Sequence, residues 1–115
     1  MRVLVVFHGC LPGSDRPTSG GALRAWHHGE ALRSDGHEVL YITRDQDEVE
    51  GGPPVFNSPK SLRQYARAAK PDRIICVQPE EAPALASLEI PLCVDLYAPR
   101  LLESVFEENT GEESI

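Results

Sequence analysis

The sequence has few cysteines and no apolar stretch long enough to cross a membrane. Its three cysteines, Cys10, Cys76 and Cys93, are widely spaced and form no CxxC pair, so we expect reduced thiols in or near the core. A catalytic thiol at Cys10 is the alternative. The first apolar run, residues 1–7, is too short for a signal peptide, and no run reaches the ~18–20 residues of a membrane helix. We therefore expect a cytoplasmic protein that is not integral to a membrane.

Basic residues are also scarce. Eleven Lys and Arg stand against eighteen Asp and Glu, for a net charge of −7. Residues 98–115 hold five Glu and only one Arg, so much of the excess lies in this segment. No basic stripe is available for a phosphate backbone, which argues against a nucleic-acid partner. His27 and His28 are adjacent, so a helix would point them in different directions; with His8 and His37 distant, we expect no metal site.

The standard nucleotide fingerprints are absent. Neither G-x-G-x-x-G nor G-x-x-x-x-G-K-[ST] occurs, and no cofactor is predicted. The chain instead has the apolar run Val3–Phe7, a polar loop over residues 8–19, and a helical pattern that starts at Gly20-Gly21. The first N–H groups of a helix have no internal partner, and paired glycines let a ligand approach the backbone. These features suit a phosphate site, but a plain helix-entry turn explains the glycines equally well.

Apolar runs and helical patterns alternate along the rest of the chain. The pattern predicts strands over 3–7, 37–43, 74–77 and 91–96, and helices over 20–34, 59–70 and 99–107, with a short helix before the last strand. Residues 44–57 are predicted to be a surface loop. We expect an α/β fold: a Rossmann-like parallel sheet of about four strands in the order 2-1-3-4, with helices on both faces. This domain would span residues 1–108, followed by a flexible acidic tail over 109–115.

Ligands of such sheets bind beyond the carboxyl ends of the strands, where the chain order reverses. His8 follows the first strand and could act as a base or hydrogen-bond donor. Gln78 ends the third strand, Arg24 could reach a phosphate or carboxylate, and Asp95 interrupts an apolar run. Three of these residues also have a structural explanation: His8 as a bonded loop histidine, Arg24 as a solvated arginine and Asp95 as a paired carboxylate. Residues 80–81 are both Glu and are expected only to complement the dipole of the short helix.

Four segments together resemble the N-terminal half of a GT-B retaining glycosyltransferase of the family 4 ("group 1") type. They are MRVLVVFHGCLP, SGGALRAWHHGEALRSDGHEVLYIT, PDRIICVQPE and IPLCVDLYAPRLLES, and they span most of residues 1–106. The resemblance implies transfer of a sugar from a nucleoside-diphosphate sugar to an acceptor, with the N-terminal domain mainly holding the acceptor. It also implies that Gly20 and Gly21 approach the donor pyrophosphate.

The chain departs from that family in two respects. Many members carry a histidine at the end of the strand that here reads Leu92–Leu96, where this chain has Asp95-Leu96-Tyr97, so Asp95 or Tyr97 would have to take its place. A complete enzyme also needs a second, donor-binding domain, so we expect no activity from this chain alone. A second domain or a partner chain would then complete the enzyme, and the exposed edge or face of a sheet cut short would favour self-association or a partner chain. The alternatives are a small flavodoxin-like binding or regulatory module without catalysis, and a partner protein that keeps only the fold.

Overall fold

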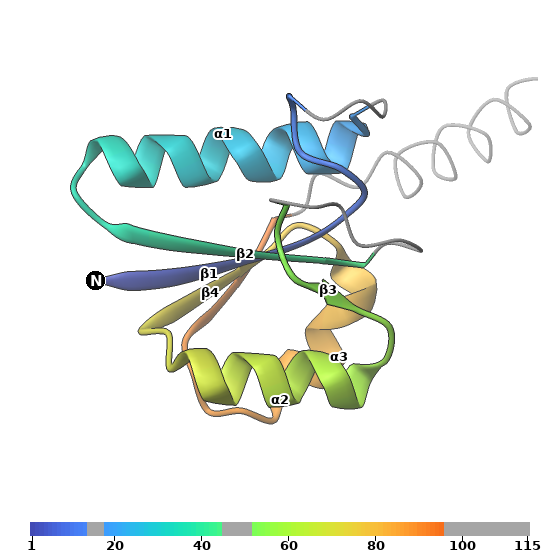
Figure 1. Cartoon of the computed structure of the whole chain (residues 1–115). Helices are drawn as coiled ribbons and strands as arrows, with labels where there is room; N and C mark the ends of the chain where they lie inside the picture. The colour runs from blue at the N-terminus through green and yellow to red at the C-terminus, as the bar shows by residue number, and fades with distance from the viewer. Residues whose placement is uncertain (14–17, 45–51, 96–115) are drawn as a thin grey trace, which may run out of the picture.

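The computed structural model describes residues 1–13, 18–44 and 52–95, and this part of the chain forms a parallel five-stranded sheet with helices on both faces (Figure 1). Helix α1 covers one face, and α2 and α3 lie on the other. The sheet order is β3-β2-β1-β4-β5. The strands are β1 (Arg2–His8), β2 (Glu38–Arg44), β3 (Val55–Phe56), β4 (Arg73–Cys76) and β5 (Leu92–Val94). The helices are α1 (Gly20–Ser34), α2 (Pro59–Ala69) and α3 (Ala82–Ala86), with a 3₁₀ turn at Pro79–Glu81.

The predicted α/β class is confirmed, and so is the relative order of the four predicted strands, which are β1, β2, β4 and β5. The prediction of a surface loop over residues 44–57 is wrong at β3. This two-residue strand pairs with the end of β2, Thr43 with Val55 and Arg44 with Phe56, and it buries the Phe56 ring. The predicted helix over 99–107, the tail over 109–115 and the domain boundary at 108 lie outside the described residues.

Helix α1 begins and ends where the sequence predicts. The Ser19 hydroxyl oxygen accepts a hydrogen bond from the backbone N–H of Ala22 at 3.1 Å, and Gly36 adopts a left-handed φ of 89° after the helix end. Gly29 is buried against β2, where a Cβ would lie 1.8 Å from the Tyr41 hydroxyl oxygen. Glycine at this position therefore sets how closely α1 approaches the sheet.

Helix α2 is delimited by equally local signals. Ser58 and Ser61 form a capping box, and Pro59 occupies the first helical position. Lys70 closes the helix with a left-handed φ of 50°. Leu62 and Ala66 are buried on its inner face. These features confirm the predicted start of α2 at residue 59.

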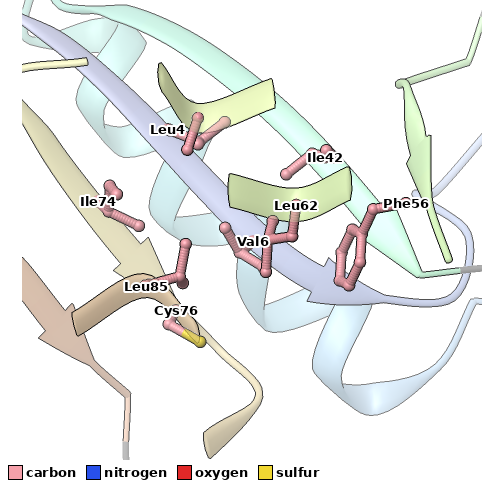
Figure 2. Close-up of a cluster of buried hydrophobic side chains, with 9 residues drawn as sticks. Leu4, Val6, Ile42, Phe56, Leu62, Ile74, Cys76 and Leu85 are labelled. Carbon is pink, nitrogen blue, oxygen red and sulfur yellow. The ribbon is translucent and has the colours of Figure 1, made fainter. Parts of the chain in front are cut away.

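The two sides of the sheet carry separate hydrophobic clusters. Leu4 and Val6 of β1 point into the cluster under α2 and α3 (Figure 2), and Val3, Val5 and Phe7 point into the cluster under α1. Both faces of β1 are buried, which explains its apolar run without alternation. The cluster in Figure 2 comprises Leu4, Val6, Ile42, Phe56, Leu62, Ala66, Ile74, Cys76 and Leu85.

Helix α3 ends at Ala86, which is exposed, and only Leu85 of this helix is buried. The predicted burial of one cysteine is wrong. Cys93 was expected in or near the core but is exposed, because β5 is the edge strand of the described sheet. Cys76 is buried as expected, and Cys10 is half-buried. Among the described helices, none is both long and apolar enough to cross a bilayer.

Candidate functional site

Polar side chains gather at the carboxyl edge of the sheet. His8 ends β1, Arg44 ends β2, Gln78 follows β4 by two residues, and Asp95 follows β5. The chain proceeds from β1 outward to β2 and β3 on one side, and then to β4 and β5 on the other. The order thus reverses between β1 and β4. Parallel sheets bind ligands outside the strand ends at such a switch point, so this edge is the candidate site.

The start of α1 packs tightly against the end of β1 and the residues after β4. The Ser19 hydroxyl donates to the carbonyl oxygen of His8 at 3.2 Å, and Gly9 turns the chain with a φ of 95°. A Cβ on Gly21 would lie 2.6 Å from Nε2 of Gln78, so the glutamine amide occupies the space that a side chain would fill. The structure therefore brings together Gly21 and Gln78, two of the residues predicted to bind a ligand.

Asp95 forms the first polar cluster, with two residues of α1. Its Oδ2 lies 2.5 Å from Arg24 Nε and 2.6 Å from His28 Nε2, and its side chain is 9% exposed. The two contacts compensate a carboxylate that is almost buried. The structure thus joins Arg24 and Asp95, which were both predicted, and adds His28, which was not. The spacing contained a signal, because residues 24 and 28 are four apart and share one helix face.

Glu81 forms the second polar cluster, which we call the His8–Glu81–Arg44 cluster. Its Oε1 lies 3.0 Å from His8 Nε2 and 3.1 Å from Arg44 Nε, and its side chain is only 6% exposed. The Arg44 guanidinium also lies 5.3 Å from the centroid of the Phe56 ring. The expectation that Glu81 only complements a helix dipole is wrong, because the 3₁₀ turn carries its carboxylate inward to the end of β1. Arg44 was missed because the predicted strand ended at residue 43, whereas β2 continues through Arg44.

The two clusters lie on opposite faces of the sheet. His8 continues the alternation of Leu4 and Val6 and faces α2 and α3, whereas Asp95 bonds to α1. Two of the predicted catalytic residues, His8 and Asp95, are therefore not brought together as one pair. The third, Tyr97, lies outside the described residues.

A shallow groove of about 460 Å³ runs along the exposed side of α1. It contains two residues predicted to bind a ligand, Gly20 and Arg24. His28 of the Asp95 cluster reaches the same groove. The lining consists of Gly20, Leu23, Arg24, His27, His28 and Ala31. The groove therefore continues from the glycine pair along the helix surface.

The thiol of Cys76 is buried and is therefore a poor nucleophile. Burial raises the pKa of its thiol to about 12, and Sγ lies 2.8 Å from the carbonyl oxygen of Gln78. The thiol therefore stays protonated at neutral pH and supports the turn after β4. Within the described ranges, no three His, Cys, Asp or Glu side chains cluster closely enough to hold a metal ion.

Comparisons of the chain with protein-family models, with curated proteins and with solved structures found no match.

Proposed function

We propose that this chain is the acceptor-side, N-terminal part of a glycosyltransferase, which moves a sugar from a nucleoside-diphosphate sugar to an acceptor. A second, donor-binding domain would complete it, on the same polypeptide or on a partner chain. The Rossmann-like parallel sheet supports the proposal, together with the sequence segments that resemble this enzyme family. One observation carries it furthest: the glycine pair that opens α1 lies at the switch point, with Gly21 against the Gln78 amide.

The chemistry of that corner suits a diphosphate. The amides of Gly20 and Gly21 have no acceptor within the helix, and the helix dipole adds partial positive charge at its start. The Gln78 amide is one more hydrogen-bond donor beside them. Arg24 lies one turn further on, but Asp95 balances its charge. The start of α1 carries little net charge, and the donor-binding domain that would hold the other side of the diphosphate lies outside residues 1–115. We therefore expect weak binding, with a dissociation constant of about 1 mM or higher for this chain alone.

An NMR titration of the 115-residue chain tests the proposal. We expect UDP-glucose and GDP-mannose to shift the amide signals of Gly20, Gly21 and Ala22, with a smaller effect from UMP, which lacks the second phosphate. Gly36, beyond the far end of α1, is the internal control. Unchanged signals at residues 20–22 up to about 10 mM sugar nucleotide would overturn the proposal. Tight binding of FMN instead would favour the flavodoxin-like module.

A paired substitution sharpens this test. Gly21→Ala places a methyl group where the Gln78 amide now lies, 2.6 Å from Nε2. The amide is the end of a flexible side chain and can move aside, so the variant should fold and bind the sugar nucleotides several-fold more weakly. Ser34→Ala, at the other end of α1, is the matched control. Turnover of a sugar nucleotide by the isolated chain would contradict the need for a second domain.

A further inference from the structure

The His8–Glu81–Arg44 cluster bridges the two strands between which the chain order reverses. His8 is the last residue of β1, and Glu81 ends the 3₁₀ turn that follows β4. The proposed diphosphate site at Gly20 and Gly21 does not include this cluster, because His8 faces the side of the sheet that α2 and α3 cover. The cluster therefore offers a second set of polar groups at the same edge.

Burial is graded across the cluster. The Glu81 side chain is 6% exposed, whereas the His8 side chain is 31% exposed. The carboxylate is thus enclosed, whereas the imidazole is partly open to solvent. An ionised carboxylate can only accept hydrogen bonds, so the 3.0 Å contact requires that Nε2 of His8 carries the proton. A neutral His8 then keeps the lone pair on Nδ1.

Arg44 makes a neutral His8 compatible with the buried carboxylate. An ionised carboxylate away from water needs a compensating charge. Arg44 Nε lies 3.1 Å from Oε1 of Glu81, at ion-pair distance but without the alignment of a hydrogen bond. Because Arg44 compensates the charge of Glu81, His8 need not be protonated to satisfy it. The cluster can therefore present an uncharged imidazole to a ligand.

The other ring nitrogen of His8 is available for that purpose. Within the described residues, Nδ1 makes no hydrogen bond, and the one fully buried side-chain nitrogen or oxygen without a hydrogen-bond partner is Arg44 Nε. The His8 side chain is partly open to solvent, so a ligand can approach its ring. A lone pair beside a carboxylate disfavours an anion and suits a hydroxyl group that donates.

We propose that Glu81 is a positioning residue, which orients the imidazole of His8 so that Nδ1 of its neutral form accepts a hydrogen bond from a hydroxyl group of a carbohydrate-like ligand. This inference rests on the proposed function, where the ligand is the acceptor. The inference places the hydroxyl group of the sugar acceptor on the side of β1 that faces α2 and α3, opposite the Asp95 cluster. Glu81 acts through His8 and does not touch the ligand.

The tautomer of His8 tests the first step without any variant. Nitrogen-15 spectra of the imidazoles at pH 8.5, where an ordinary histidine is neutral, should show His8 with its proton on Nε2. The exposed His27 of α1 is the internal reference and should show a mixture of tautomers. A proton on Nδ1 of His8, or the same mixture as His27, would overturn the proposal.

Titration with methyl α-D-glucopyranoside and methyl α-D-mannopyranoside tests the second step. We expect at least one of them to shift Nδ1 of His8, and we expect Glu81→Gln to weaken that response about three- to tenfold. Glu80→Gln is the matched control, because residue 80 is an exposed glutamate of the same turn. If Nδ1 of His8 responded to the glycosides equally in Glu81→Gln and in wild type, Glu81 would have only a structural role, which would contradict the inference.

Three further outcomes separate this inference from the proposed function. A response of His8 to inorganic phosphate but not to the glycosides would make the cluster an anion site and overturn the hydroxyl assignment. An unchanged nitrogen-15 signal of His8 with all of these probes would also overturn the hydroxyl assignment. The signals of Gly20 and Gly21 with UDP-glucose are recorded on the same sample. If they respond while His8 does not, the diphosphate proposal stands and the His8 inference falls.

Discussion

Replacing Gly29 with alanine should destabilise the protein, although alanine is the better helix former. A Cβ at this position would lie 1.8 Å from the hydroxyl oxygen of Tyr41, 2.4 Å from Cζ and 2.8 Å from Cε1. All three distances are below contact distance, so the ring or the helix must move. The ring has little room, because Tyr41 is buried, stands edge-on to Phe7 at 6.0 Å, and has the Arg33 guanidinium 5.5 Å from its centroid.

The net effect is a difference between two terms. Alanine gains roughly 1 kcal/mol over glycine inside a helix. Overpacking a core by one methyl group costs about 1–3 kcal/mol, and contacts this short place Gly29→Ala at the upper end. We therefore expect a loss of about 2 kcal/mol in the free energy of unfolding, which corresponds to a fall in Tm of about 8 °C for a domain of this size.

Urea denaturation, followed by circular dichroism and by the fluorescence of Trp26, measures this loss. In a Tyr41→Leu background the ring atoms are gone, so Gly29→Ala should become neutral or stabilise by up to about 1 kcal/mol. His27→Ala, on the exposed side of the same helix, should stay within about 0.5 kcal/mol of wild type. The reasoning would be refuted if Gly29→Ala raised the stability of wild type or had the same effect in both backgrounds.

Three other predictions concern a helix cap, the thiols and alkaline pH. Ser58→Ala removes the acceptor of the α2 capping box and should lower the free energy of unfolding in urea by about 1 kcal/mol; no measurable change would contradict the cap. A thiol reagent at pH 8 should modify exposed Cys93 far faster than Cys76, whose pKa burial raises to about 12, and equal rates in the folded protein would contradict this difference. Burial raises the pKa of Tyr41 from 10.0 to about 12, so the folded state holds this proton more tightly than the unfolded chain. The contribution of Tyr41 to the free energy of unfolding is complete below pH 10 and is lost as the pH rises toward 12. Tyr41→Phe should therefore flatten the fall in the free energy of unfolding between pH 10 and 12. An unchanged slope in this variant would contradict the raised pKa.

Much of the fold was predictable because its signals are local. The apolar run Val3–Phe7 predicted β1, and the helical patterns over residues 20–34 and 59–70 predicted α1 and α2, which the structure confirms. The two-residue strand β3 was missed because it is too short to show a period, and its position depends on pairing with β2. Cys93 was placed in or near the core because an apolar sequence cannot distinguish an edge strand from a central one.

The candidate site was only partly predictable. The sequence indicated that polar residues would collect at the carboxyl edge, because parallel strands end together there. It did not indicate which side chains meet. Glu81 was assigned to a helix dipole because the acids in the first turn of a helix are ordinarily solvated, and only the packing of the 3₁₀ turn against β1 shows that it is buried.

Hydrophobic periodicity and capping act between residues a few positions apart, so the amino-acid sequence alone was enough to predict helices α1 and α2 and the α/β class. The pairs of side chains that make the site come from the tertiary packing. Glu81 meets His8 across 73 positions, and Asp95 meets His28 across 67. Such pairs depend on strand register, on the rotation of each helix and on which face of the sheet a residue occupies. Those quantities are set by the packing of the two hydrophobic clusters as a whole, which no short stretch of sequence contains.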